Sequence, residues 1–303
     1  MRDLALYRRD LVAGLAVPLF AAPMFLVSGP QLVIETVKAG AIGSFPTLNA
    51  RNPDLLNVWL DEISQACRDA SAPWAANLVL GKTNTRRESD LAAVVRFRAP
   101  MVIASVGAPD EVVTAVRAYG GQVFCDVATL RHARRAIAAG VDGLILLTAG
   151  AGGHTGWLNP FAFVKAVRAM FSGPIAVAGG ITDGREIRAL EVIGADLGYV
   201  GTPFIATPES LAPKAYRESL VAAGIDDVLE TTVVSGMRAN FLRGSLAAEG
   251  YLDDEGRPKR PEGAVKSAWA RVWSAGHGVG SIAKVRPASE VVAGFVESYR
   301  AVN

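Results

Sequence analysis

The chain has 303 residues, of which 50% are hydrophobic and 20% are charged. A chain of this length in which half of the residues are apolar can form a large core. The composition therefore excludes a disordered chain, a collagen-like chain and a small disulfide scaffold. The 31 basic and 29 acidic residues leave a net charge of +2. The arginines form scattered pairs rather than one basic stripe, so we expect no nucleic-acid partner.

The N-terminal region imitates a signal peptide, because Arg8 and Arg9 precede an apolar run over 11–27. Pro18 and Pro23 interrupt this run, which is too short to span a bilayer. We interpret it as a short segment that leads into a buried first strand, and we expect no membrane partner.

The two cysteines, Cys67 and Cys125, are far apart and fit no C-x-x-C spacing. The sequence therefore indicates neither a disulfide framework nor a zinc site, and we expect no metal. A reducing, cytoplasmic location fits this cysteine usage.

Short apolar runs rich in Val, Ile and Ala recur along the chain, and amphipathic stretches separate them. Continuous apolarity is typical of parallel strands buried on both faces. The predicted strands are 18–24, 41–45, 74–80, 101–106, 122–126, 143–148, 174–178 and 197–201. The predicted helices are 31–38, 53–69, 88–97, 110–118, 130–138, 161–170 and 183–190. This alternation favours an α/β fold, a (β/α)8 TIM barrel, with a doubly wound open sheet as the alternative.

The last third of the chain has a different texture. Residues 1–205 would form the barrel, and 206–275 would form a small, mostly helical insertion after strand 8 that covers the substrate. Residues 276–303 would return to the barrel, because 288–299 regain a helical period and can supply the final barrel helix.

A glycine-rich loop follows the sixth predicted strand and continues to Trp157. Gly152 and Gly153 let the backbone approach a flat ligand, and His154 titrates near neutrality in its ordinary state, which suits proton transfer. The alternative is a flexible surface loop with a solvated histidine.

Two further turns follow the seventh and eighth predicted strands. Gly179 and Gly180 open one helix, and Gly201 and Thr202 form a second turn. In barrels this pair of positions is the usual phosphate cradle, although each turn alone is also explained as a plain tight turn.

Other strand ends carry candidates for the same mouth. Ala22, Pro23 and Met24 end the first strand and offer a flat apolar surface for a ring system, with core packing as the alternative. Asn77 in the third strand requires a hydrogen-bond partner. Asp126 ends the fifth strand as either a second proton acceptor or the N-cap of the next helix.

Together these motifs resemble the nitronate monooxygenase family, formerly called 2-nitropropane dioxygenases, whose relatives include the flavin-dependent enoyl-acyl-carrier-protein reductases. The matching stretches run in order over essentially the whole chain; they are Ala22-Pro23-Met24, Ala151-Gly152-Gly153-His154-Thr155-Gly156, Ala178-Gly179-Gly180-Ile181 and the stretch from Gly194-Ala195-Asp196 to Gly201-Thr202.

The resemblance implies FMN bound across the barrel mouth. Its phosphate would contact Gly179, Gly180, Gly201 and Thr202, and the remaining cofactor contacts would be Ala22, Pro23, Met24, Asn77, Asp126, Gly152 and Gly153. His154 matches the family's general base, and the substrate would contact His154, Trp157 and His277. Two residues depart from the pattern: Asp126 stands where a cationic or neutral residue is usual, and His277 stands where Gln is expected.

We therefore expect an FMN-dependent oxidoreductase that oxidises nitronates, nitroalkanes or a related acidic-carbon compound with O2 as acceptor. The alternative is an FMN-dependent reductase or dehydrogenase of acyl thioesters that uses reduced nicotinamide. A further alternative is a flavin-free phosphate-binding barrel. The sequence leaves open whether the chain forms a homodimer.

Overall fold

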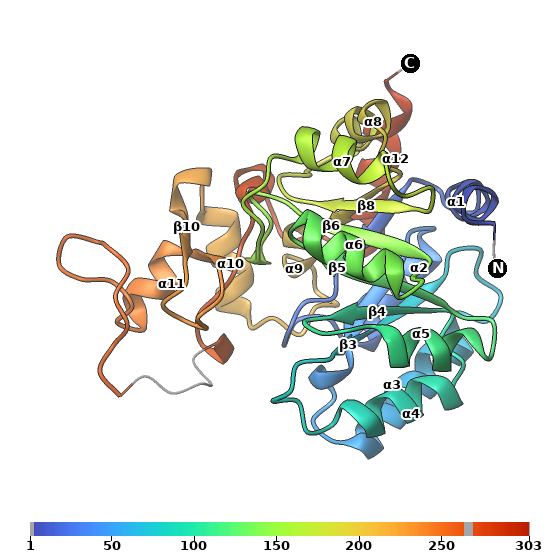
Figure 1. Ribbon diagram of the computed structural model, residues 1–303. Coiled ribbons are helices and arrows are strands. Elements are labelled where there is room, and N and C mark those ends of the chain that lie inside the picture. Colours follow the sequence, from blue (N-terminus) through green and yellow to red (C-terminus); the bar gives the residue numbers. More distant parts are fainter. Residues whose placement is uncertain (1–2, 264–268, 303) are drawn as a thin grey trace.

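The computed structural model describes residues 3–263 and 269–302. Eight parallel strands form a sheet in the order β1-β9-β8-β6-β5-β4-β3-β2. A bridge between Phe20 and Ile42 joins its two edges and nearly closes the barrel. The strands are β1 (Leu19–Ala21), β2 (Gly43–Pro46), β3 (Trp74–Val79), β4 (Met101–Ser105), β5 (Gln122–Val127), β6 (Gly143–Leu147), β8 (Ile175–Ala178) and β9 (Leu197–Val200). The prediction of a (β/α)8 TIM barrel is confirmed (Figure 1).

Helices surround the barrel. They are α2 (Pro30–Lys38), α3 (Pro53–Ala66), α4 (Arg87–Arg96), α5 (Asp110–Arg117), α6 (Leu130–Ala138), α7 (Pro160–Arg168), α8 (Gly184–Ile193) and α12 (Ala288–Arg300). Gly194 ends α8 with φ of +104°, a left-handed conformation that glycine adopts at little cost. Among the described residues, none of the helices combines the length and apolar character that crossing a bilayer requires.

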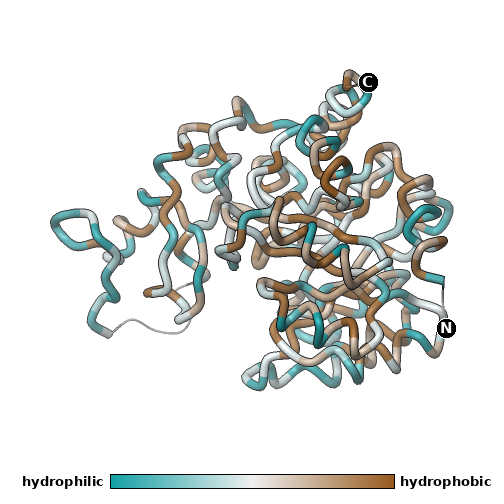
Figure 2. The backbone as a smooth tube through the Cα atoms, turned by 45° about the horizontal axis from the view of Figure 1, so that its top comes forward, coloured by the Kyte–Doolittle hydropathy of each residue, from teal (hydrophilic) through white to brown (hydrophobic). Residues whose placement is uncertain are grey.

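The apolar residues form one layer inside the barrel and another between the strands and the helices. Figure 2 shows the hydrophobic strands at the centre and hydrophilic loops around them. An additional helix, α1 (Leu4–Ala13), lies at the end of the barrel away from the covering segment (Figure 1). There the Tyr7 hydroxyl donates to Gln122 Oε1 at 2.7 Å, and Arg8 pairs with buried Asp196.

Residues 206–275, here called the covering segment, follow the short helix α9 (Thr202–Ile205). Within its described residues are α10 (Lys214–Ala222), η2 (Ile225–Asp227), β10 (Val228–Thr231), β11 (Ala239–Leu242) and α11 (Arg243–Ala248). The two strands join β7 (Gly153–His154) in an antiparallel sheet of three strands. The expectation of a mostly helical insertion therefore missed this sheet. Short strands paired with a loop of the barrel leave only a weak periodic signal in the sequence.

Candidate active site

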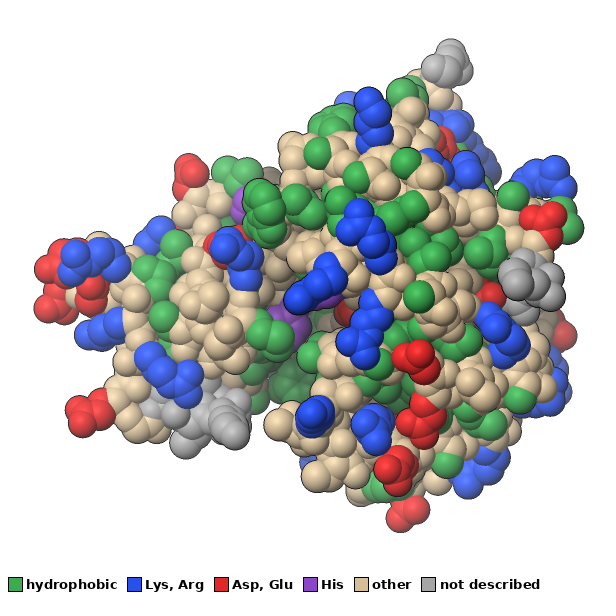
Figure 3. Space-filling model, in the orientation of Figure 1, with side chains coloured by type: hydrophobic (Ala, Val, Ile, Leu, Met, Phe, Trp, Pro, Cys, Tyr) green, Lys and Arg blue, Asp and Glu red, His purple; other side chains and the backbone are tan. Residues whose placement is uncertain are grey.

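A cavity of about 400 Å³ lies at the carboxyl ends of the barrel strands. Loops from the barrel line one part of it, and the covering segment and the turn η4 (His277–Ser281) line the rest. Figure 3 shows a hollow between the barrel and the covering segment, with histidine side chains beside it. Ligand sites of TIM barrels occur at this face, so the cavity is the candidate active site.

The loop that carries His154 is held firmly on the barrel. The Thr148 hydroxyl donates to the carbonyl of Ala178 at 2.6 Å, and the Thr155 hydroxyl donates to the carbonyl of Thr148 at 2.9 Å. From the covering segment, Asn240 Nδ2 donates to the carbonyl of Ala151 at 2.7 Å. These bonds argue against a flexible surface loop. Asn240 is a residue that the sequence analysis did not identify.

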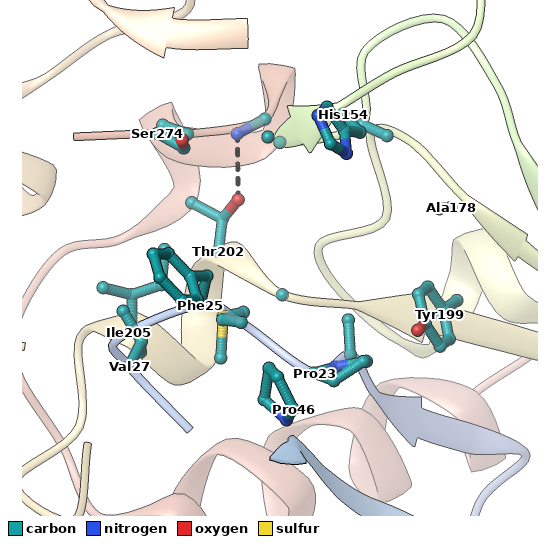
Figure 4. Close-up of a pocket in the computed structure, with 18 of the residues that line it drawn as sticks. Pro23, Phe25, Val27, Pro46, His154, Ala178, Tyr199, Thr202, Ile205 and Ser274 are labelled. Carbon is teal, nitrogen blue, oxygen red and sulfur yellow. Dashed lines mark hydrogen bonds between the residues drawn. The ribbon is translucent and has the colours of Figure 1, made fainter. Parts of the chain in front are cut away.

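His154 faces the cavity from β7, close to the covering segment (Figure 4). Its Nε2 atom is buried and has no hydrogen-bond partner among the residues that the structure describes. Burial lowers the pKa of His154 below its ordinary value of 6.5, because a charged imidazolium loses its hydration there. The imidazole is therefore neutral near pH 7, and its unpartnered nitrogen is available to a ligand.

The two predicted glycine turns meet at the cavity. Gly180 has φ of +69°, and a Cβ atom built on it would meet no atom within 4 Å. Within the described part of the chain, the backbone N–H groups of Gly180 and Gly201 have no protein acceptor. Unpaired amides at neighbouring loops form an anion site, so these residues fit a phosphate group.

The third wall of this cradle comes from the turn around η4. Thr202 Oγ1 accepts a hydrogen bond from the N–H of Gly276 at 2.9 Å, which is the dashed line in Figure 4. A Cβ atom on Gly276 would lie 2.7 Å from the carbonyl oxygen of Gly150, so only glycine fits there. Gly276 and Gly278 both line the cavity, although the sequence analysis named only His277 in this turn.

Polar side chains from three adjacent strands form a chain of hydrogen bonds at the cavity. Asn77 Nδ2 donates to Ser105 Oγ at 2.6 Å, and the Ser105 hydroxyl and the N–H of Val106 donate to the Asp126 carboxylate. Val106 has φ of +59°, a strained conformation for a β-branched residue. Asn77 thus has the partner that its position requires, and Ser105 is a site residue that the sequence analysis missed.

The interpretation of Asp126 as a helix cap is wrong. The N-cap of α6 is Thr129, whose side chain accepts from the N–H of His132 at 3.2 Å. Asp126 instead lines the cavity. Burial raises the pKa of Asp126 from 3.8 to about 6, and the hydrogen bonds from Ser105 and Val106 only partly oppose this effect.

We expect Asp126→Asn to be more stable than the unsubstituted protein at pH 8, and the difference to shrink as the pH falls towards 4. The folded-state pKa is raised, so the carboxyl group destabilises the fold increasingly as the pH rises from about 3.8 to about 6, and by a constant amount above that. About 3 kcal/mol is the expected gain at pH 8, because the pKa rises from 3.8 to about 6 and each pKa unit corresponds to about 1.4 kcal/mol. Urea unfolding at both pH values measures it. Asp10→Asn, on an exposed position of α1, should give a far smaller pH-dependent gain.

Residues of the barrel and of the covering segment form the apolar part of the cavity. Ala22, Pro23 and Met24 after β1 lie on the barrel side, where Figure 4 labels Pro23 and Pro46. Aromatic residues that the sequence analysis did not single out line the rest; these are Phe25, Tyr199, Tyr216, Trp269 and Trp273. Tyr216 and Trp273 are stacked, with ring centroids 5.1 Å apart. Among the described residues that line the cavity, Asp126 and His154 are the only acidic or basic side chains, so the lining is chiefly apolar.

Two predicted substrate contacts lie outside the cavity lining. Trp157 is 67% exposed and lies just before α7. His277 is exposed, and its ring lies beside Gly150 while its neighbours Gly276 and Gly278 line the cavity. The structure thus brings together Ala22, Pro23, Met24, Asn77, Asp126, Gly152, Gly153, His154, Gly179, Gly180, Gly201 and Thr202, but not Trp157 or His277.

Comparison with known proteins gives matches over nearly the whole chain. A curated nitronate monooxygenase of Paraburkholderia phytofirmans is 26% identical over 90% of this chain and 84% of its own length. A (3aS,4S,5R,7aS)-5-hydroxy-7a-methyl-1-oxo-octahydro-1H-indene-4-carboxyl-CoA dehydrogenase of Mycobacterium tuberculosis is 27% identical over 77% of this chain. The match spans 65% of that dehydrogenase.

A solved structure of nitroalkane oxidase from Streptomyces ansochromogenes superimposes with a TM-score of 0.80 and 23% identity, covering 96% of this chain and 98% of that one. At this identity the likeness shows the fold. The sequence model described as nitronate monooxygenase matches residues 10–297. This chain therefore belongs to the nitronate monooxygenase family.

Proposed function

We propose that this protein is an FMN-dependent oxidoreductase that oxidises nitroalkanes, nitronates or a related acidic-carbon compound with O2 as acceptor. The observation that carries the proposal is the buried, unpartnered Nε2 atom of His154 in a cavity that also contains a glycine cradle. The family match and the name of the Paraburkholderia relative support the substrate class.

The residues present fit FMN. The free amides of Gly180 and Gly201, beside Gly179 and Thr202, would hold its phosphate. The apolar residues that follow β1 and the amide of Asn77 line the cavity and would lie near the ring system of FMN. When bound, FMN supplies a two-electron acceptor that O2 can reoxidise.

The chain's own groups would handle the proton and exclude water. His154 Nε2 is placed to accept a proton from the carbon next to an electron-withdrawing group, because it is neutral and makes no competing hydrogen bond. Asp126 would act as a second polar contact whose charge changes around pH 6. The apolar wall strengthens these interactions by keeping water away.

An acyl thioester is the second candidate substrate class. The name of the Mycobacterium tuberculosis relative, a carboxyl-CoA dehydrogenase, and the size of the aromatic-lined cavity favour it. A carbon next to a thioester carbonyl is also acidic, so His154 would serve the same purpose.

The absorption spectrum of the gently purified protein tests the proposal. Bound FMN should be visible, and anaerobic mixing with a nitroalkane or its nitronate should bleach it. Bleaching by acyl thioesters or reduced nicotinamide alone would favour the second candidate. A colourless protein that takes up no added FMN would contradict both.

A further inference from the structure

Within 3–263 and 269–302, no residue makes the hydrogen bond to the imidazole of His154 that usually orients a general base. Its Nε2 atom is unpartnered, and among the described residues no group makes a side-chain hydrogen bond to the ring. Catalytic histidines are commonly fixed by a carboxylate or carbonyl on the second nitrogen. Some other contact must therefore hold this ring in place.

That contact is made by the covering segment. The indole of Trp269 meets the His154 ring edge to face, with 4.9 Å between centroids and 62° between planes. Trp269 also meets Phe241, with centroids 5.0 Å apart. Phe241 is fully buried in β11, the strand that pairs with β7. The three rings thus form a row anchored in the small sheet, and Trp269 also lines the cavity.

We propose that Trp269 is a positioning residue for His154, which holds the imidazole by aromatic packing and forms a dry wall on one side of it. Edge-to-face pairs prefer a defined geometry, so the indole restricts rotation of the imidazole. The catalytic consequence rests on the proposed function, in which His154 accepts the proton, but the positioning itself does not.

Among the described residues, the elements next to this row carry several charged or titratable groups. Asp126 lines the same cavity, and His277 lies on the adjoining turn; the neighbouring hairpin and α11 carry the ion pairs Glu230–Arg238 and Glu249–Arg271. Burial is the cause that lowers the pKa of His154. Loss of the indole should therefore admit water and let this pKa rise towards 6.5.

The experiment measures the pKa of His154 by NMR in Trp269→Ala and Trp269→Phe. The chain contains three histidines, so the resonance is assigned by its loss in His154→Gln. Trp269→Ala should raise the pKa, and Trp269→Phe should restore it because a ring is kept. Trp157→Ala is the matched control, since Trp157 is exposed and does not line the cavity.

Proton abstraction from a neutral nitroalkane gives the second readout. At saturating substrate, Trp269→Ala should lose about tenfold to 100-fold and Trp269→Phe much less, because a misplaced base is less effective. An unchanged pKa of His154 in a folded Trp269→Ala variant would overturn the positioning role. A raised pKa in Trp269→Ala, together with full activity in His154→Gln, would retain the positioning role and overturn the role of His154 as the base. A raised pKa in Trp269→Ala, with no flavin reduction by a nitroalkane in the unsubstituted protein, would retain the positioning role and overturn the proposed function.

Discussion

Replacing His154 with alanine is expected to lower the rate of flavin reduction by a neutral nitroalkane by about 100-fold to 10,000-fold, the usual contribution of a general base. The same variant should lose much less on the preformed nitronate, because no proton remains to be removed. Flavin content should stay near normal, since the glycine cradle belongs to other loops. Anaerobic stopped-flow reduction with both substrate forms measures the two losses.

The pH dependence gives a second test of the same role. A protonated His154 cannot accept a proton, and burial lowers its pKa. The rate of proton abstraction should therefore be constant above pH 6.5 and fall only at lower pH.

Equal losses on both substrate forms in His154→Ala would indicate that the ring positions an anion. No loss on either form would remove His154 from the chemistry.

The barrel itself was predictable from sequence because each buried parallel strand is a continuous apolar run. Predicted and observed strands differ by at most a few residues, as in 101–106 against Met101–Ser105. The covering segment was less predictable, since its strand β10 is only partly buried and β7 has two residues.

The residues of the candidate site also differ in how far the sequence predicts them. A residue fixed by backbone needs, such as Gly180 with φ of +69°, carries a local signal because no other residue type is as permissive. Ser105 and Trp269 carry none, since their roles depend on neighbours far away in the chain. Trp157 does not line the cavity, because closeness to His154 in sequence does not fix the direction of a side chain.

Replacing Gly180 with valine is expected to lower the bound flavin at least tenfold while the barrel stays folded. Gly180 has φ of +69°, so a β-branched residue strains the turn, and its side chain would enter the open space of the cavity. Both effects act where the free amides would meet a phosphate. The ratio of flavin to protein absorbance measures occupancy, and circular dichroism checks the fold.

Gly120→Val separates the two effects. Gly120 has φ of +89° and, like Gly180, open space where a Cβ atom would lie, but it does not line the active-site cavity. Its replacement should therefore cost similar backbone strain and leave flavin occupancy unchanged. If both variants lose flavin, strain and not phosphate contact governs binding. If neither does, the phosphate lies elsewhere, because a valine side chain and a phosphate cannot occupy the same space beside Gly180.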